Sequence, residues 1–209
     1  MALLLALPVI ASAQDEVPKV EIFGGYSYLR LDNATGLSVA STTGTTTSVV
    51  TAPLDRDLNG FGVSVTNNLN SWLGITAEFS GHFTDAQVNG QTLDRDAYIV
   101  TAGPRLAIRR FERFTPFLHI MAGMARQDVQ VQNASSTVST IGSINQQDSG
   151  LAFVVGGGVD LNLSSRLGVR LLQTDYILTR FSNRNGTSSE LNQANFRAST
   201  GFVLKLGEQ

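Results

Sequence analysis

The 209-residue sequence has no cysteine, few charged residues and, after its first residues, no long apolar segment. The absence of cysteine excludes a disulfide scaffold, a thiolate metal site and a thiol nucleophile. Charged residues make up 15% of the chain, below the ~25% that is usual in soluble domains. The formal net charge of -2 excludes a strongly basic nucleic-acid binder, and the length fits one domain.

Residues 1–13 predict a signal peptide, although no Lys or Arg precedes their apolar core. This core ends in Ala11-Ser12-Ala13, the small-x-small pattern of a signal peptidase site, so the mature domain is expected over 14–209. The core is too short for a membrane-spanning helix, which needs about 20 apolar residues. The longest later apolar run, 151–159, contains three glycines.

The remaining chain is dominated by strand signals, because β-branched and aromatic residues alternate with small and polar ones between turn-forming residues. The pattern predicts an all-β fold with eight strands, at about 20–31, 58–67, 71–83, 96–108, 115–126, 150–162, 166–178 and 194–206. These lengths are near the ~9–11 residues that a tilted membrane strand needs.

The predicted connections differ in length in a regular way. Three are short, at 68–70, 109–114 and 163–165, and four are long, at about 32–57, 84–95, 127–149 and 179–193. The long ones are rich in Ser, Thr, Asn, Gln and Gly. Short turns at one end and long loops at the other are typical of an antiparallel up-and-down transmembrane barrel. An even number of strands puts both chain termini at the short-turn end.

One face of the predicted strands is apolar and the other is small and polar, which leaves two kinds of barrel open. Within 71–83, Leu73 and Ile75 share one parity, and Glu78 and His82 share the other. A soluble lipocalin-like ligand-binding barrel turns its apolar face inward, whereas a membrane barrel turns it to lipid. The polar face carries too few charges for a solvated outer surface, so the pattern favours the membrane barrel.

Two strands have an ambiguous register. In 166–178 we expect Arg170 inside, but continuing its parity puts Gln173 and Asp175 on the lipid side. Either a bulge shifts the register or these residues rise above the bilayer. In 20–31, two sets of residues compete for the lipid face: Ile22, Tyr26 and Tyr28 against Phe23, Leu29 and Leu31.

Several short motifs resemble those of one family. Phe23-Gly24-Gly25-Tyr26-Ser27-Tyr28-Leu29-Arg30 resembles the first strand of OmpA-like outer-membrane β-barrel domains. Pro116-Phe117, Gly156-Gly157-Gly158-Val159-Asp160 and Val169-Arg170 resemble later strands of the same family. The resemblance covers about 18–206. It implies an eight-stranded barrel in the outer membrane of a Gram-negative bacterium, with short periplasmic turns and long extracellular loops.

The last predicted strand resembles the C-terminal signal that the barrel insertion machinery reads. Ser199, Gly201, Leu204 and Leu206 occupy its polar, glycine and two hydrophobic positions. The family usually has an aromatic residue at the final position, where this chain has Leu206. The resemblance implies that the insertion machinery and outer-membrane lipids are partners of this chain.

The inward parity also predicts a barrel-interior ion-pair network. Its expected members are Glu78, Arg105, His119, Asp160, Arg170 and Arg197. Asp160 and Arg170 flank the turn at 163–165 almost symmetrically, so they are expected to face each other on adjacent strands. Such a network would fill a narrow barrel and pair its desolvated charges. The alternative interpretation of these residues is a narrow pore or a proton path.

No catalytic, cofactor-binding or metal-binding residues are predicted. The two histidines, His82 and His119, have neither metal-ligand spacing nor a serine at a telling distance in sequence. Some outer-membrane lipid-modifying enzymes have eight strands, so His82, beside Phe83 and Asp85, keeps an enzyme open as an alternative. Gly156-Gly157-Gly158 lacks the Lys-Ser/Thr of a phosphate-binding loop.

The sequence therefore predicts a structural or surface-interaction role, either adhesion or envelope integrity, without catalysis. An extracellular partner is expected to bind through the long loops, since loops on a rigid scaffold commonly carry binding sites. Arg109, Arg110 and Arg113, beside Phe111 and Phe114, are interpreted as a solvated turn at an aromatic girdle. Contact with a periplasmic partner is the alternative for this turn.

Overall fold

The computed structural model describes residues 17–31, 37–43, 46–52, 57–88, 91–132, 145–181 and 191–208. These residues form ten strands: β1 (Pro18–Leu31), β2 (Leu37–Thr43), β3 (Thr46–Ala52), β4 (Asp57–Asn68), β5 (Leu73–Val88), β6 (Gln91–Ala107), β7 (Phe114–Gln132), β8 (Asn145–Asn162), β9 (Leu167–Phe181) and β10 (Leu191–Glu208). Among them there is no helix that is long and apolar enough to cross a membrane. The predicted signal peptide, 1–13, lies outside the described residues.

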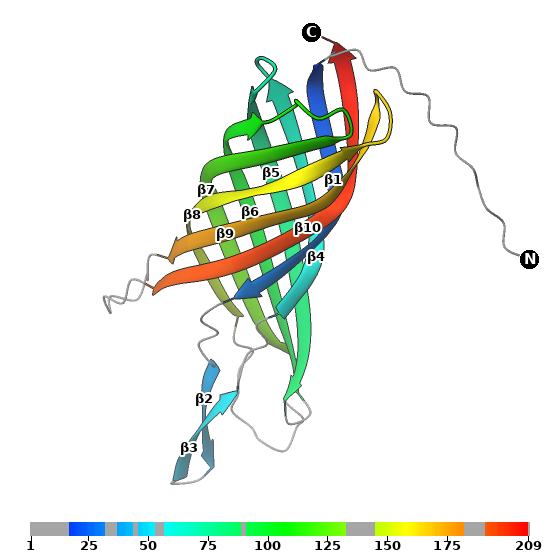
Figure 1. Cartoon of the computed structure of the whole chain (residues 1–209). Helices are drawn as coiled ribbons and strands as arrows, with labels where there is room; N and C mark the ends of the chain where they lie inside the picture. The colour runs from blue at the N-terminus through cyan, green and yellow to red at the C-terminus, as the bar shows by residue number, and fades with distance from the viewer. Residues whose placement is uncertain are drawn as a thin grey trace, which may run out of the picture.

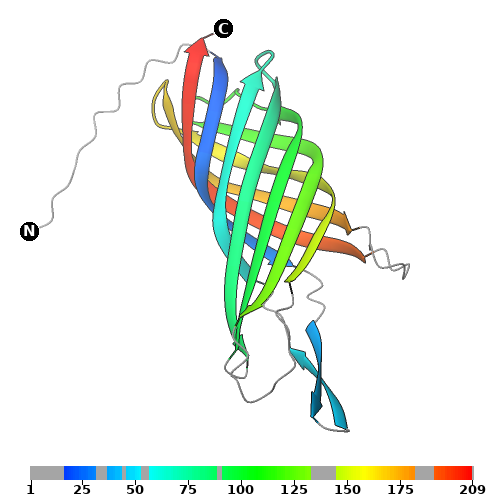
Figure 2. The same ribbon diagram turned by 180° about the vertical axis from the view of Figure 1, so that it is seen from behind.

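Eight strands form one closed antiparallel barrel in the order β1-β10-β9-β8-β7-β6-β5-β4, which confirms the predicted fold (Figure 1). Strand β1 pairs with β4 on one side and with β10 on the other, so the first and last strands close the barrel. Strands β2 and β3 pair with each other in a separate hairpin. This hairpin projects from the barrel end opposite to that where β1 begins and β10 finishes (Figures 1 and 2).

The outer wall of the barrel is apolar, which is the arrangement expected of a barrel in lipid. Leu118, Ile120 and Met124 of β7 all point outward, with 62% or more of their surface exposed. Outward apolar side chains on the other barrel strands include Ile22, Val63, Ile75, Val100, Phe153, Leu172 and Phe202. A soluble ligand-binding barrel would have the opposite arrangement.

Aromatic residues mark both ends of this apolar wall. All four tyrosines of the chain, Tyr26, Tyr28, Tyr98 and Tyr176, have the outward parity in the half of the barrel toward the long loops. Trp72, Phe111 and Phe114 are exposed at the short-turn end. Aromatic girdles of this kind lie at the two membrane–water interfaces of membrane barrels.

The structure resolves both ambiguous strands. In β1, Phe23, Leu29 and Leu31 face inward, and Ile22 and Tyr26 face outward.

In β9 a bulge shifts the register: Arg170 pairs with Asp160 and Gly201, whereas Gln173 already pairs with Ser199. Leu171 and Leu172 both face outward at this bulge, and residues after it change parity. Of the two alternatives for this strand, the bulge is therefore confirmed, and Gln173 and Asp175 are both buried in the lumen.

Several barrel strands continue into segments predicted as loops. Strand β5 runs to Val88 and β6 begins at Gln91, so most of the loop expected at 84–95 is paired strand. Strands β7, β8, β9 and β10 also extend beyond their predicted ends toward the long loops. Above a bilayer both faces of a strand meet water, so backbone pairing continues there without the apolar alternation that marks strands. The expectation of loops throughout these segments is wrong for that reason.

The seam between β1 and β10 depends on two glycines that face each other. Gly25 pairs with Gly201, and a Cβ on Gly25 would stand 2.1 Å from the backbone oxygen of Thr200 and 2.7 Å from the Cα of Gly201. The neighbouring Gly24 faces outward, and nothing lies within 4 Å of its Cβ position. Two adjacent glycines therefore have opposite packing environments.

The half of the lumen toward the long loops is closed by an apolar layer. Its buried side chains, contributed by six strands, are Leu29, Leu31, Leu58, Ala97, Ile99, Met121, Ala125, Ala152, Val154 and Ile177. Buried polar side chains, among them His82, Arg95, Gln193 and Asn195, share this half of the lumen. The barrel interior thus has a charged zone toward the periplasm and a zone of mixed, mainly apolar packing toward the long loops.

Candidate functional site: the charged interior of the barrel

All six predicted network residues lie inside the barrel. Glu78, Arg105, His119, Asp160, Arg170 and Arg197 are each buried. They come from six different strands, β5 to β10, because their parity points them toward the barrel axis. Two connected groups of contacts include them, one near the short-turn end and one at mid-height.

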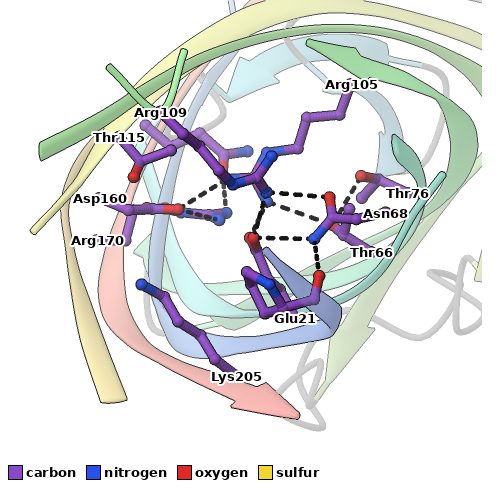
Figure 3. Close-up of polar contacts among 12 residues, drawn as sticks. Glu21, Thr66, Asn68, Thr76, Arg105, Arg109, Thr115, Asp160, Arg170 and Lys205 are labelled. Atoms are coloured by element: carbon purple, nitrogen blue, oxygen red, sulfur yellow. Dashed lines mark hydrogen bonds and ion pairs between the residues drawn. The ribbon is translucent and has the colours of Figure 1, made fainter. Parts of the chain in front are cut away.

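The group at the short-turn end is centred on Arg105 (Figure 3). Arg105 Nη1 lies 2.9 Å from Glu21 Oε2, and Arg105 Nη2 lies 2.7 Å from Asp160 Oδ2. Arg170 Nε donates to the other oxygen of Asp160 at 2.8 Å. Arg109, from the turn after β6, reaches Glu21 Oε1 at 2.6 Å. Strands β1, β6, β8 and β9 are therefore joined across the lumen.

Strand β4 joins this group through neutral side chains. Asn68 donates to Glu21 at 3.1 Å and to the backbone oxygen of Pro18 at 2.7 Å. Thr66 accepts a hydrogen bond from Arg105 at 3.3 Å. These contacts give Glu21 partners from three strands or turns, as a buried carboxylate requires.

The group at mid-height is centred on Arg197. Its guanidinium donates to Asp175 Oδ2 at 2.6 and 2.9 Å and to Ser80 at 3.0 Å, and it forms an ion pair with Glu78. His119 Nε2 lies 2.8 Å from the other oxygen of Asp175. Asp175 thus connects β7, β9 and β10.

Gln173 links the two groups. Arg170 Nη1 donates to Gln173 Oε1 at 2.6 Å, and Gln173 Nε2 donates to Asp175 at 2.8 Å and to Glu78 at 3.2 Å. The amide therefore connects a cation of one group to two carboxylates of the other. Every barrel strand contributes at least one side chain to the resulting network.

Two aromatic rings extend the network at the short-turn end. The Phe117 ring lies 4.0 Å from the Arg105 guanidinium carbon and 4.5 Å from that of Arg170. Phe23 faces Arg170 from another side, at 4.2 Å. Cations that stand over ring faces are stabilised by the ring quadrupole, most strongly where water is excluded. The two guanidiniums lie near each other because both donate to Asp160, and the rings add to their stabilisation.

The charges of the network are close to balanced. Four buried carboxylates, Glu21, Glu78, Asp160 and Asp175, contact four guanidiniums, Arg105, Arg109, Arg170 and Arg197. Removing one partner of a buried ion pair in such an interior leaves an unpaired charge, which strongly destabilises the folded protein.

Sequence reasoning missed several members of this network. Glu21 lies at the start of the ambiguous strand β1, and Asp175 and Gln173 follow a bulge that the sequence left as one of two alternatives. Arg109 was interpreted as part of a solvated turn, but its side chain turns back to Glu21. Two leucines in succession, Leu171-Leu172, are a further signal of the bulge, because strict alternation would point one of them into the polar lumen.

His82 is also in the lumen, where its side chain has no solvent-exposed surface. Its Nε2 lies 2.9 Å from Ser27 Oγ, and Ser27 lies 2.9 Å from Ser199 Oγ. No hydrogen bond to His82 Nδ1 is found within the described part of the chain, so an orienting carboxylate is missing. Neither histidine reaches the outer surface, where a lipid substrate would lie. Among the described residues, no His, Cys, Asp and Glu cluster could hold a metal ion.

The predicted insertion-signal residues lie along β10. Ser199 and Gly201 face the lumen, and Leu204 and Leu206 face outward with about half of their surface exposed. The hydrophobic positions are thus available on the outer wall. Recognition of this strand by the insertion machinery stays a prediction.

An apolar outer wall, two aromatic girdles and a filled, charged interior define a transmembrane β-barrel. The sequence matches the family described as "Outer membrane protein beta-barrel domain" over residues 1–203, and the chain belongs to that family. The protein is therefore located in the outer membrane of a Gram-negative bacterium. Its short turns face the periplasm and its long loops face the exterior.

Two solved structures illustrate the fold. Ail, the attachment invasion locus protein of Yersinia pestis, in complex with the heparin analogue sucrose octasulfate, has a TM-score of 0.55 at 16% identity, covering 88% of this chain and 97% of that chain. Neisserial surface protein A, NspA, has a TM-score of 0.54 at 10% identity, covering 90% of this chain and 97% of that chain. A comparison of the sequence with curated proteins gives no match.

Proposed function

We propose that this protein is a closed, non-conducting membrane anchor that presents extracellular strands to a surface partner. The observation that carries this proposal is that strands β5, β6, β7 and β8 continue as paired strands beyond the closed part of the barrel. Residues 84–88 of β5 pair only with β6, and residues 145–149 of β8 pair only with β7, among the described strands. Within the part of the chain that the structure describes, each segment therefore presents one unpaired edge.

Unpaired edges suit a role in binding. Their free N–H and C=O groups can pair with an extended segment of another protein, while side chains add specificity. The β2–β3 hairpin, rich in Ser and Thr, projects at the same end (Figure 2). The structural neighbour Ail is named for attachment, which supports the same class of role.

The lumen supports an anchor better than a pore. The charged network crosses it near the periplasm, and the apolar layer closes it toward the exterior. A hydrated ion would have to cross both zones. Desolvation among the apolar side chains of that layer is a further obstacle.

We therefore expect no single-channel current from the purified protein in a planar lipid bilayer. A general porin, reconstituted in the same bilayer, is the positive control for the measurement. Regular conductance steps that change with Glu78→Gln or Arg197→Gln would instead establish the narrow pore.

We expect bacteria of a non-adherent strain to attach severalfold better to an epithelial monolayer when they display this protein. Replacing 37–52 by a short Gly-Ser turn should reduce attachment, because it removes the projecting hairpin and leaves all eight barrel strands. Heat-dependent mobility in SDS gels would show that the shortened barrel still folds. Arg113→Gln, at the opposite end, is the control that should attach normally. Equal attachment with and without the protein would contradict the proposal.

A further inference from the structure

The three periplasmic turns, 69–72, 108–113 and 163–166, form a rim that is apolar and charged at once. Leu69, Trp72, Phe111 and Leu163 each expose more than half of their surface. Large apolar side chains at the tips of turns are unfavourable in water. They are favourable in the interfacial region of a membrane, where aromatic side chains are enriched. The rim is therefore built to rest in the headgroup region.

The charged side chains of this rim are mostly cations. Arg110, Arg113, Arg166 and Lys19 are exposed, against one exposed carboxylate, Glu112, among the described side chains at this end. No ion pair of these four cations is found within the described residues. Arg109, by contrast, is occupied by Glu21 inside the barrel.

The extracellular end has a different balance. Its described outward-facing charges are three arginines, Arg30, Arg126 and Arg180, and four aspartates, Asp57, Asp94, Asp96 and Asp128. Arg126 pairs with Asp128 at 3.1 Å, and the Tyr28 hydroxyl donates to Asp57 at 2.6 Å. Among the described side chains, the excess of positive charge is thus confined to the periplasmic rim.

We propose that the rim binds the phosphate groups of anionic phospholipids, such as phosphatidylglycerol, in the inner leaflet of the outer membrane. Arg110, Arg113 and Arg166 are the principal ligands, because a planar guanidinium donates two parallel hydrogen bonds to phosphate oxygens. The exposed apolar residues of the same turns place these guanidiniums at headgroup depth. This inference goes beyond the proposed surface role and does not depend on it.

Trp72 provides a local reporter, since it is the only tryptophan of the chain and lies on the rim. Its fluorescence would be measured in phosphatidylcholine bilayers that contain increasing fractions of brominated phosphatidylglycerol or brominated phosphatidylcholine. Bromines near the headgroup end of the acyl chains quench a neighbouring indole. The ratio of the two quenching curves gives the relative affinity of the anionic lipid for sites beside Trp72.

We expect the wild-type protein to favour phosphatidylglycerol severalfold and to lose this preference at high salt, because screening weakens exposed charge pairs. Arg110→Gln/Arg113→Gln/Arg166→Gln should bring the ratio close to one, since it removes the three guanidiniums whose attraction to anionic headgroups sets the preference. The corresponding triple lysine variant, which keeps the charges, should retain most of the preference.

Arg30→Gln/Arg126→Gln/Arg180→Gln is the matched control. It removes the same number of charges from the outward surface at the other end, so the ratio reported by Trp72 should stay at the wild-type value. A wild-type ratio of one would overturn the proposal and leave the rim to a periplasmic protein. An equal preference in the wild type and in the rim glutamine variant would overturn it as well. So would an equal loss of preference in the rim glutamine variant and in the control variant with Arg30, Arg126 and Arg180 replaced. Quenching by brominated phosphatidylcholine shows in each case that Trp72 is in the bilayer.

Discussion

Replacing Arg197 with methionine is expected to lower the free energy of unfolding by about 3–5 kcal/mol, the usual cost of removing one partner from a buried ion pair. Arg197 is 1% exposed and contacts Asp175, Glu78 and Ser80. Methionine keeps much of the side-chain volume but leaves two carboxylates without their shared cation. Urea unfolding of the barrel in phospholipid vesicles would measure the change.

Arg126→Met is the control for this prediction. Arg126 also pairs with an aspartate, but it lies on the outer surface with 51% of its side chain exposed. Exposed pairs contribute about 1 kcal/mol or less, so this variant should unfold near the wild-type urea concentration. Adding Glu78→Gln and Asp175→Asn to Arg197→Met should recover part of the loss, because the stranded charges are then gone. Unchanged stability of Arg197→Met would show that the network does not hold the barrel together.

Gly25→Ala is expected to prevent normal closure of the barrel. The new methyl group would meet the backbone of Thr200 and Gly201 at 2.1–2.8 Å, and backbone atoms on a paired strand cannot move aside cheaply. Overpacking costs typically about 1–3 kcal/mol even in an adjustable core, so this contact at the closing seam should cost at least that much. The folded barrel should lose its resistance to SDS in unheated gel samples.

Gly24→Ala is the matched variant one residue away. A Cβ at this position faces outward with nothing within 4 Å, so the barrel should fold as in the wild type. The variant should therefore show the same mobility shift on heating in SDS gels as the wild type. Because both substitutions add the same methyl group to the same strand, any difference between them comes from the packing at the seam. If both variants ran alike, the β1–β10 contact at Gly25 would be looser than the structure shows.

The sequence predicts the barrel well because alternate residues of a membrane-barrel strand face lipid and lumen, and the two environments select different residue types. Apolar positions such as Ile75 and Ile120 fall on the lipid side, and Glu78 and Arg197 on the other, by parity alone. The number of barrel strands and the order of short and long connections follow from the same pattern. Parity also placed six titratable residues inside, although it could not say which of them touch.

The contacts themselves depend on features that parity does not carry. The bulge at Leu171-Leu172 turns Asp175 inward, and Asp175 then becomes the partner of Arg197 and His119. Arg109 folds back from a turn, which depends on the length of its side chain and on the position of Glu21 across the lumen. Such contacts join residues far apart in sequence, so they become visible only when all strands are in place.

The extracellular extensions could not be read from apolar alternation for a different reason. Above the bilayer neither face of β5 or β6 is lipid-facing, so their ends carry polar residues of both parities. The Asn89-Gly90 dipeptide between Val88 and Gln91 is nevertheless a strong sequence signal for a tight hairpin. Giving weight to that dipeptide would have shortened the predicted loop at 84–95.

The pairing of β1 with β10 has a consequence for the order of events during folding. Six of the eight seams join strands that follow each other in sequence, but the contact of Ser27 with Ser199 spans 172 residues. Contacts between distant parts of a chain form late, because a large loop must first be closed. Until then the sheet is open and its arginines and carboxylates remain hydrated. Closure of this last seam and dehydration of the lumen are therefore one step, which makes assembly of the barrel all-or-none.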